Sequence, residues 1–373
     1  MEELLGKYKG CLLGGAVGDA LGYPVEFMKT DEIIEEYGRD GIREHKLYQG
    51  KALVSDDTQM SLFTICGLLK GYTRFCLRGI MGDWASYVHL AYRDWMITQF
   101  ENYGYPVKAG ASWLLNVPEL YSCRAPGNTC LNALETNKCG RIYSPLNNSK
   151  GCGGVMRVAP VGLYLTKHIE DIKAVDRVGV EVAAITHGHP LGYVPAAALV
   201  HIIARTVTTE ASLEEIVTEA IQVVCEMYQD KEGIEIFRGL MEQAVELSHG
   251  DKQDVDAVSM LGEGWTAEEA LAIAVYCSLK YSDDFAGAVC AAVNHSGDSD
   301  STGAITGNIL GAYLGLEQIP AAYLEQLEMR ELIEELAEDL YGDCKMTEHG
   351  DYRDQIWVDK YIYGTYTGQY GSV

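Results

Sequence analysis

The stretch GCLLGGAVGDALG, residues 10–22, carries a glycine at every fourth position, and GAITGNILGAYLG, residues 303–315, repeats that spacing. Residues four apart form a ridge along one face of an α-helix. A ridge of glycines lets another backbone come close, because glycine has no Cβ. The same spacing is typical of packed membrane helices, but Asp19 and the charged flanking residues argue against lipid. We therefore expect two central helices, over 10–22 and 302–315, that pack together and hold the functional loops beside them.

Most of the remaining chain also has helical patterns. Two helices should begin near 212 and 266, because Ser212 with Glu215 and Thr266 with Glu269 have the spacing of a capping box. Periodic apolar residues predict further helices over 3–22, 57–70 (ended by Gly71), 83–99, 171–187, 191–206, 284–294, 302–315 and 321–340. The patterns together predict an all-α fold in a single domain, residues 1–373.

Three segments depart from this helical pattern. Residues 47–54, LYQGKALV, suggest a short pair of strands. Residues 101–155 contain Pro, Gly, Asn and Cys without a clear period, so we interpret this long loop as functional. The tail, residues 341–373, is rich in Tyr and Gly, and its aromatic side chains are expected to pack on the body of the domain.

The composition narrows the class of protein. The net charge is -25, and no Lys/Arg cluster offers the basic surface that nucleic-acid binding requires. The start of the chain has no basic segment followed by an apolar one, and no uncharged run of 18 apolar residues occurs, so we expect neither secretion nor a membrane span. Eleven scattered cysteines are typical of reduced thiols in a cytoplasmic protein.

Two acidic motifs stand before predicted helices. Ser55-Asp56-Asp57-Thr58 supplies more oxygen atoms than helix capping needs. In the second motif, residues 295–302, Asp298 and Asp300 are two positions apart, and on an extended loop their carboxylates would point the same way. Either motif alone could be a capped helix with a solvated acidic turn. Together they offer four carboxylates and two hydroxyl groups, which suits two hard divalent cations that share ligands.

The sequence resembles the ADP-ribosylglycohydrolases, the family that contains dinitrogenase-reductase-activating glycohydrolase and the ADP-ribosylarginine hydrolases. Five motifs occur in the family's order and cover most of the chain. They are GCLLGGAVGDALGYPVEF (10–27), SDDTQM (55–60), GCGGVMRVAPVGL (151–163), Thr186-His187, and HSGDSDSTGAITGNILGA (295–312). Any one motif would be suggestive, whereas five in order are highly specific.

The resemblance implies an orthogonal helix bundle with two Mg²⁺ or Mn²⁺ ions at its centre. The metal ligands carried over by motif are Ser55, Asp56, Asp57, Asp298, Asp300 and Ser301. Glu26 and Asp300 would be catalytic, and Gly151, Cys152, Gly153, Gly154 and His187 would bind the substrate, with the glycines forming an anion nest for the pyrophosphate. Asp19 could be catalytic or hold the structure by hydrogen bonds, and Arg157 could bind a phosphate or pin its own loop. Family members often have Asn at the position of Cys152, which leaves the ligand contacts there open.

The resemblance thus implies a hydrolase that releases ADP-ribose from a modified protein side chain, with ADP-ribosyl-arginine as the first choice. Hydrolysis of ADP-ribosyl-serine or of O-acetyl-ADP-ribose is the alternative within enzymes. A non-catalytic ADP-ribose-binding or structural relative is the alternative outside them, and a purely structural relative has no need of all four aspartates. The expected partners are an ADP-ribosylated protein and ADP-ribose itself, and the oligomeric state stays open.

Overall fold

The computed structural model describes residues 2–104 and 112–370, so residues 105–111 of the predicted functional loop and 371–373 of the tail lie outside the described residues. The α-helices are α1 (Glu2–Gly22), α2 (Thr30–Tyr37), α3 (Asp56–Arg78), α4 (Trp84–Phe100), α5 (Asn128–Glu135), α6 (Ala159–Leu165), α7 (Ile172–Ala184), α8 (Pro190–Thr208), α9 (Leu213–Met227), α10 (Ile234–Ser248), α11 (Asp254–Leu261), α12 (Ala267–Lys280), α13 (Phe285–Val293), α14 (Ser299–Leu314), α15 (Ala321–Glu325), α16 (Arg330–Gly342) and α17 (Gln355–Val358). Strands β1 (Leu47–Tyr48) and β2 (Lys51–Ala52) pair antiparallel, with Leu47 opposite Ala52. The all-α prediction is confirmed.

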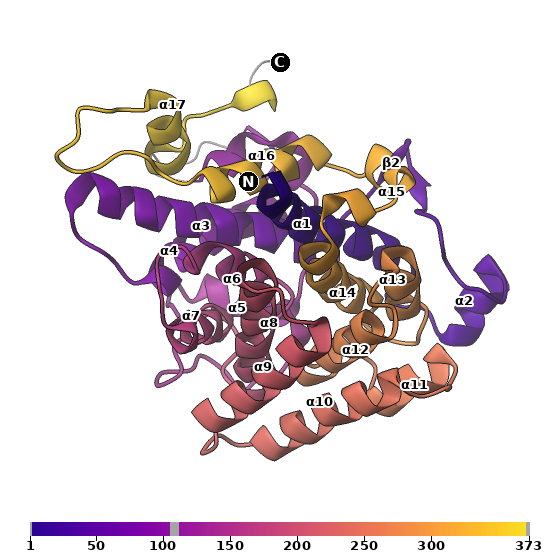
Figure 1. Cartoon of the computed structure of the whole chain (residues 1–373). Coiled ribbons are helices and arrows are strands. Elements are labelled where there is room, and N and C mark those ends of the chain that lie inside the picture. Colours follow the sequence, from indigo (N-terminus) through magenta and orange to yellow (C-terminus); the bar gives the residue numbers. More distant parts are fainter. Residues whose placement is uncertain (1, 105–111, 371–373) are drawn as a thin grey trace.

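The two glycine-rich helices, α1 and α14, lie side by side in the middle of the molecule (Figure 1). They run antiparallel, because Gly10 meets Gly311 and Gly18 meets Gly303. A Cβ built on Gly18 would lie only 1.9 Å from the carbonyl oxygen of Gly303, and one on Gly10 would lie 2.2 Å from that of Gly311. No other residue fits at such an approach, so the predicted core position of this helix pair is confirmed.

The sequence predicted that this helix ends at Gly71, but α3 does not end there. It continues to Arg78 and ends at Gly79, whose φ of 65° is the left-handed conformation that favours glycine at a helix end. A Cβ on Gly71 would lie 2.8 Å from the ring of Tyr87, so this glycine serves the close packing of α3 on α4. Tertiary packing, not helix termination, explains the residue.

The two predicted capping boxes have different outcomes. Ser212 and Glu215 form the reciprocal hydrogen bonds at the start of α9. Helix α12 begins after Thr266 as predicted, but the Thr266 side chain caps nothing. Glu269 instead accepts a hydrogen bond of 3.3 Å from the backbone N–H of Glu263. The acid is used to hold the preceding loop, and that loop borders the site described below.

The predicted helix over 321–340 is divided into α15 and α16. Met329 has a φ of 55°, which an α-helix cannot accommodate. Between the two helices, the carbonyl of Gln326 accepts from the N–H of Ala52 at 2.8 Å, and the N–H of Glu328 donates to the carbonyl of Ala52 at 3.0 Å. The interruption therefore exists because this segment pairs with β2.

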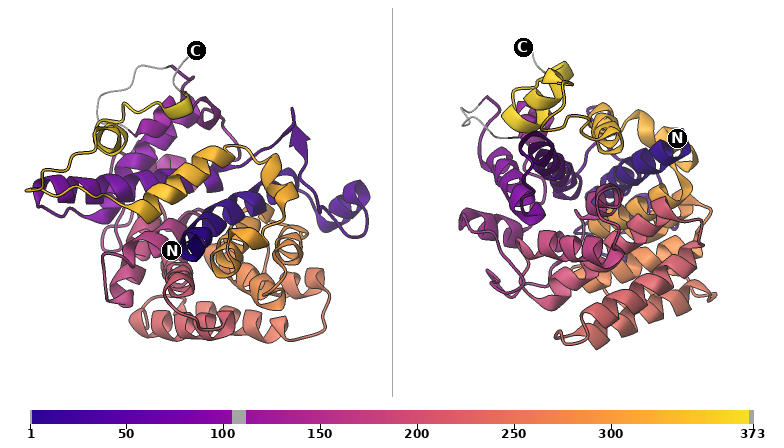
Figure 2. Two further views of the ribbon diagram at one scale, coloured as in Figure 1. Left: turned by 45° about the horizontal axis from the view of Figure 1, so that its top comes forward. Right: turned by 60° about the vertical axis from the view of Figure 1, so that its left-hand side comes forward.

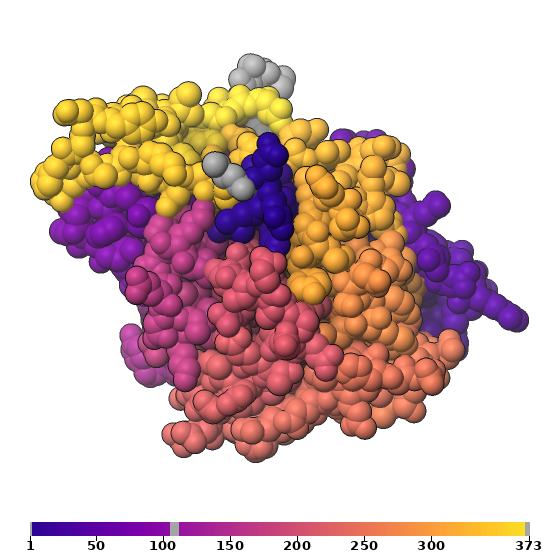
Figure 3. Space-filling view, viewed as in Figure 1, coloured from indigo at the N-terminus to yellow at the C-terminus, as the bar shows by residue number. Residues whose placement is uncertain are grey.

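The tail follows α3 and α16 on one side of the molecule (Figure 2) and covers that end in the space-filling view (Figure 3). Trp357 Nε1 donates to Thr73 Oγ1 on α3 at 2.8 Å. The ammonium of Lys360 contacts Glu335 and Asp339 on α16 at 2.5 and 2.6 Å. Tyr361 is buried in the same contact. Aromatic packing and these ion pairs attach the tail.

Among the described residues, α8 is long and apolar enough to cross a membrane by length and composition alone. Most of it is buried inside the protein, where it contacts α6, α7, α9, α12 and α14. A buried core helix passes the same test, so the observation is weak evidence for a membrane span.

Candidate active site

A cavity of about 430 Å³ brings together segments from both ends of the chain. The first and second acidic motifs, the glycine loop after residue 150 and the loop before α12 all contribute to its wall. Its lining residues are Glu26, Phe27, Asp56, Asp57, Ala125, Pro126, Gly127, Asn128, Thr129, Cys130, Gly151, Cys152, Gly153, Met156, His187, Trp265, Asp298, Asp300 and Ser301.

The first acidic motif forms the start of α3. Ser55 is the N-cap, and its hydroxyl oxygen accepts from the N–H of Asp57 at 3.3 Å. Asp19, on α1, accepts from the N–H groups of Ser55 and Thr58 at 2.9 and 3.1 Å. Asp19 does not line the cavity, and its hydrogen bonds attach the first motif to α1. The geometry therefore supports the structural role for Asp19.

The second acidic motif forms the start of α14. The sequence suggested that Asp300 lies on an extended loop. The helix begins at Ser299, however, so Asp300 lies in its first turn. Asp298 is the N-cap, and Asp300 Oδ1 accepts from the N–H of Ser301 at 2.9 Å. Helix starts favour negative charge, because their free N–H groups and the helix dipole point at it. Two helix starts thus bring their acids to one cavity.

Glu26 follows the end of α1 and lies in the same cavity as the two acidic motifs. Because α1 and α14 are antiparallel, the end of α1 lies beside the start of α14, and a Cβ on Gly22 would be 2.6 Å from the Cα of Asp300. One carboxylate oxygen each from Glu26, Asp298 and Asp300 can be chosen so that all lie within 4.8 Å of one another. The glycine ridge therefore determines which carboxylates meet.

Burial and mutual repulsion dominate the electrostatics of this cluster. Burial, followed by the charges of Asp300 and Asp298, raises the pKa of Glu26 to about 10. Burial also raises the pKa of Asp56, Asp57, Asp298 and Asp300 above the usual aspartate range. Glu26 Oε2 and Asp57 Oδ2 are buried without a hydrogen-bond partner. Such groups are costly without compensation, and oxygen donors in this number fit a hard divalent cation.

Ser301 lines the cavity with the acids, whereas Ser55 is wholly buried beneath it. A hydrogen bond from Ser55 helps to lower the pKa of Asp300 against the effect of burial. The structure thus brings five of the six predicted metal ligands, all except Ser55, to the cavity wall.

The predicted anion nest is less open than expected. The N–H of Gly151 donates to Ser149 Oγ at 3.3 Å, and the N–H of Cys152 donates to the carbonyl of Trp265 at 3.1 Å. Gly154 packs on the backbone of α8, where a Cβ would lie 2.5 Å from the carbonyl oxygen of Gly192. Gly151, Cys152 and Gly153 line the cavity, and Gly154 is outside the set that does.

His187 lines the cavity as the last member of a hydrogen-bonded chain. Arg157 Nη2 donates to Thr186 Oγ1 at 2.6 Å, so the single Thr186 hydrogen is free to donate to His187 Nδ1 at 2.9 Å. The neutral imidazole then carries its proton on Nε2. Arg157 also lies 4.3 Å from the centre of the Tyr92 ring and is fully buried. Arg157 therefore pins its loop, through Thr186 and Tyr92, and does not line the cavity.

The burial of His187 at the end of these hydrogen bonds predicts an effect of pH on the stability of the protein. Burial, then the charge of Arg157, lowers the pKa of His187 from 6.5 to about 3. Below pH 6.5, His187 stays neutral in the folded protein but gains a proton in the unfolded chain. The free energy of unfolding that is present above pH 6.5 therefore decreases as the pH falls toward 3. The limit is about 1.4 kcal/mol per pH unit.

In chelator, His187→Asn should therefore lose less unfolding free energy than the wild type between about pH 6.5 and pH 5, measured by urea denaturation. Other buried histidines titrate equally in both proteins and cancel in the comparison. Equal losses would contradict this assignment.

Phe27 and Trp265 are cavity residues that the sequence analysis missed. Their rings stack at the mouth, 5.9 Å apart with an interplanar angle of 20°. Phe27 stays 73% exposed and Trp265 38% exposed. Nothing in the sequence indicates that Phe27, next to Glu26, or Trp265, just before α12, would be exposed at the cavity.

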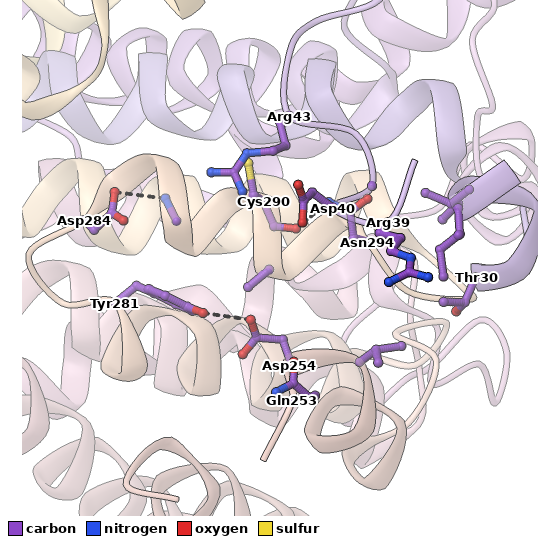
Figure 4. Close-up of a pocket in the computed structure, with 16 residues that line it drawn as sticks. Thr30, Arg39, Asp40, Arg43, Gln253, Asp254, Tyr281, Asp284, Cys290 and Asn294 are labelled. Atoms are coloured by element: carbon purple, nitrogen blue, oxygen red, sulfur yellow. Dashed lines mark hydrogen bonds between the residues drawn. The ribbon is translucent and has the colours of Figure 1, made fainter. Parts of the chain in front are cut away.

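A second cavity of about 350 Å³ lies between α2, α11 and α13 (Figure 4). Two of its acids, Asp254 and Asp284, already serve the fold. Asp254 accepts from Tyr281 at 2.7 Å, and Asp284 accepts from the N–H of Gly287 at 3.0 Å as the cap of α13. The first cavity, with its unpartnered carboxylate oxygens, is the stronger candidate for catalysis.

The sequence profile of the family described as ADP-ribosylglycohydrolase matches residues 1–350. ADP-ribosylhydrolase ARH3 of Mus musculus is 28% identical over 57% of this chain and 64% of that protein. ADP-ribosylarginine hydrolase Tri1 of Pseudomonas putida is 23% identical over 94% of this chain and 82% of that protein. A solved structure titled "ADP-ribosylglycohydrolase-related protein complex" superposes with a TM-score of 0.62 and 25% identity over 92% of this chain and 99% of that one.

Proposed function

Because this chain belongs to the ADP-ribosylglycohydrolase family, we propose that it hydrolyses the N-glycosidic bond between ADP-ribose and an arginine side chain of a protein. The observation that carries the proposal is the meeting of Glu26, Asp298 and Asp300 within 4.8 Å, next to Asp56 and Asp57. A purely structural relative would gain nothing from burying so many carboxylates, because each is costly without a cation.

Two divalent cations, Mg²⁺ or Mn²⁺, would be held by Asp56, Asp57, Asp298, Asp300 and Ser301, with Ser55 supporting Asp300. When bound, they would supply positive charge that binds the ribose hydroxyl groups and orients the anomeric carbon. The unpartnered oxygens of Asp57 and Glu26 support this assignment.

Glu26 is the proton-transfer group in this proposal. Its Oε2 is buried without a hydrogen-bond partner and the residue lines the cavity, so this oxygen is free to accept a proton. The carboxylate takes a proton from the attacking water, the water oxygen bonds to C1 of the ribose, and the C1–N bond breaks. The leaving guanidine gains the proton, so the products are ADP-ribose and unmodified arginine.

The rest of the cavity suits the remainder of ADP-ribose. The Nε2–H of His187 can donate to the pyrophosphate, beside the glycine loop that lines the cavity. The stacked rings of Phe27 and Trp265 offer an aromatic surface for a flat group. The acidic surroundings favour a cationic guanidinium on the leaving side.

The choice of linkage is tested with arginine-linked and serine-linked ADP-ribosyl peptides, each with Mg²⁺, with Mn²⁺ or with EDTA. We expect ADP-ribose release from the arginine-linked peptide in the presence of either cation and none in EDTA. The relative named for arginine matches over 94% of this chain, which supports arginine as the first choice. Release from the serine-linked peptide or from O-acetyl-ADP-ribose alone would favour the alternative enzyme. Binding of ADP-ribose without turnover of any substrate would favour a non-catalytic relative.

Cation binding should also stabilise the folded protein. The cluster repels itself without a cation, so the ion binds the folded state and not the unfolded chain. At a free cation concentration of 100 times the dissociation constant, the unfolding free energy should rise by about 2.7 kcal/mol over that in EDTA. Urea denaturation at constant ionic strength measures the difference, with added NaCl as the control. Equal stability in MgCl₂, MnCl₂ and EDTA would contradict a cation site.

A further inference from the structure

The segment from Ser122 to Gly127 forms part of the cavity wall and is held at both ends by α3. Gln59 Nε2 donates to the carbonyl of Ser122 at 3.0 Å, and the N–H of Gly127 donates to Asp56 Oδ2 at 3.2 Å. The part of this segment that lines the cavity is Ala125, Pro126 and Gly127. The shape of the wall here therefore depends on the few residues that join Ser122 to Gly127.

Ala125 has an unfavourable backbone conformation. Its φ of 50° lies in the left-handed region, which residues other than glycine rarely adopt. Pro126 follows it, and a residue before proline favours an extended backbone instead. Such a conformation persists only where the surrounding structure holds it, and it is found mostly at binding and catalytic sites. The contacts of its neighbours must therefore hold Ala125 in place.

Arg124, directly before Ala125, makes a two-pronged ion pair with Glu328. Its Nη2 donates to Glu328 Oε1 at 2.9 Å, its Nη1 donates to Oε2, and the two side chains are only 12% and 9% exposed. The same Nη1 donates to the carbonyl of Val54 at 2.9 Å. Glu328 is itself fixed, because its N–H donates to the carbonyl of Ala52 in the segment that pairs with β2. Two parallel bonds to a fixed carboxylate give the guanidinium a defined orientation.

We propose that Arg124 is a positioning residue for ADP-ribose: its pair with Glu328 holds Ala125 in the left-handed conformation and keeps residues 125–127 in the shape that the ligand contacts. The inference rests on the proposed function, because it assumes that ADP-ribose occupies this cavity. Without the ion pair, Ala125 relaxes to an ordinary conformation before the ligand binds. Binding then has to restore the left-handed conformation, and the free energy spent on this is lost from the affinity.

The first acidic motif has an attachment of its own, so the two parts of the site can be tested separately. Asp19 accepts from the N–H groups of Ser55 and Thr58, and these bonds do not involve Arg124. Loss of the Arg124 ion pair should therefore weaken binding of ADP-ribose more than binding of a cation.

Calorimetric titration of the full chain with ADP-ribose in MgCl₂ measures this effect. Arg124→Ala should weaken binding on the order of 10- to 100-fold, the size expected for restoring one strained residue. Arg124→Lys should weaken it as well, because an ammonium group cannot make the two parallel bonds. This second variant keeps the positive charge, so it serves as the test if circular dichroism shows that Arg124→Ala does not fold.

Lys360→Ala is the matched control, and Ala125→Gly is the rescue. Lys360 is also a mostly buried cation paired with acids, but it lies on the tail, so its loss should lower the unfolding free energy and leave ADP-ribose binding unchanged. Glycine adopts a φ of 50° without strain, so Ala125→Gly added to Arg124→Ala should recover part of the lost affinity. Hydrolysis of the arginine-linked peptide should follow the same order, with KM raised and kcat changed much less, because binding alone is weakened.

The remaining outcomes separate this proposal from the proposed function. Unchanged affinity for ADP-ribose in the Arg124 variants would overturn the positioning role, and the proposed hydrolysis would still stand. Equal losses of affinity in Arg124→Ala and Lys360→Ala, or no recovery with Ala125→Gly, would also overturn it, because the effect would then be general destabilisation. A wild type that binds no ADP-ribose would overturn both.

Discussion

Asp300→Asn is expected to abolish cation-dependent release of ADP-ribose while leaving the helical fold intact. Asp300 lies in the first turn of α14 and is one of the three carboxylates that meet within 4.8 Å. An amide keeps the shape and can still accept from the N–H of Ser301, but it removes the negative charge that a cation and the transition state require. We expect kcat/KM to fall on the order of 10²–10⁴-fold, as for loss of a proton-transferring or ligating group.

The same variant should not be destabilised in EDTA. The pKa of Asp300 is raised in the folded state, so ionisation of this group opposes folding as the pH rises above the ordinary aspartate range. Removing the charge relieves its repulsion with Glu26 and Asp298. Urea denaturation should therefore give an unfolding free energy equal to or above that of the wild type at neutral pH. The added stability on binding cation should shrink in parallel.

Asp283→Asn is the matched control for this variant. Asp283 is exposed on the loop before α13 and lies away from the cavity, so its activity and cation response should match those of the wild type. Full activity in Asp300→Asn would exclude the proposed site. Loss of activity through unfolding, with no change in cation response, would instead assign Asp300 to the fold.

Gly18→Ala should produce a large loss of stability from the addition of one methyl group. A Cβ at this position would lie 1.9 Å from the carbonyl oxygen of Gly303, which is backbone and cannot rotate away. The helices α1 and α14 would have to separate, and overpacking of a core usually costs about 1–3 kcal/mol and sometimes more. Because the same helix pair places Glu26 beside Asp300, cation binding and activity should fall as well.

Gly6→Ala is the control on the same helix. A Cβ on Gly6 would meet nothing within 4 Å. Alanine is the better helix former, so this variant should be stabilised by up to about 1 kcal/mol. Opposite signs for the two substitutions, measured by urea denaturation, would separate helix propensity from helix packing. Equal effects would contradict the close contact of α1 with α14.

Much of the fold could be predicted where the signal is local. Ser212 and Glu215 cap α9 as expected, because a capping box is formed within four residues. The prediction that Gly71 ends a helix was wrong. A sequence does not distinguish a glycine that ends a helix from one that makes room for a neighbouring side chain, here the Tyr87 ring. The break at Met329 was also missed, because it depends on pairing with Ala52, which is far away along the chain.

The candidate site divides in the same way. Four aspartates in two motifs and Glu26 were selected from the sequence, and the structure places all five on one cavity wall. Phe27 and Trp265 were missed, because their importance lies in their exposure and their stacking. The Cys152–Asp298 contact could not be predicted either, since it joins two loops through the packing of several helices.

The sequence by itself determined the helix starts that carry the acids and the glycine spacing that lets α1 and α14 touch. Both are properties of a few consecutive residues, so local geometry expresses them. Only the tertiary structure decided which carboxylates meet, that Thr186 sets the tautomer of His187, and that a thiol faces Asp298. These depend on distances between remote segments and on removal of water. A carboxylate in solution is an ordinary acid, but beside Asp298 and Asp300 burial raises the pKa of Glu26 to about 10.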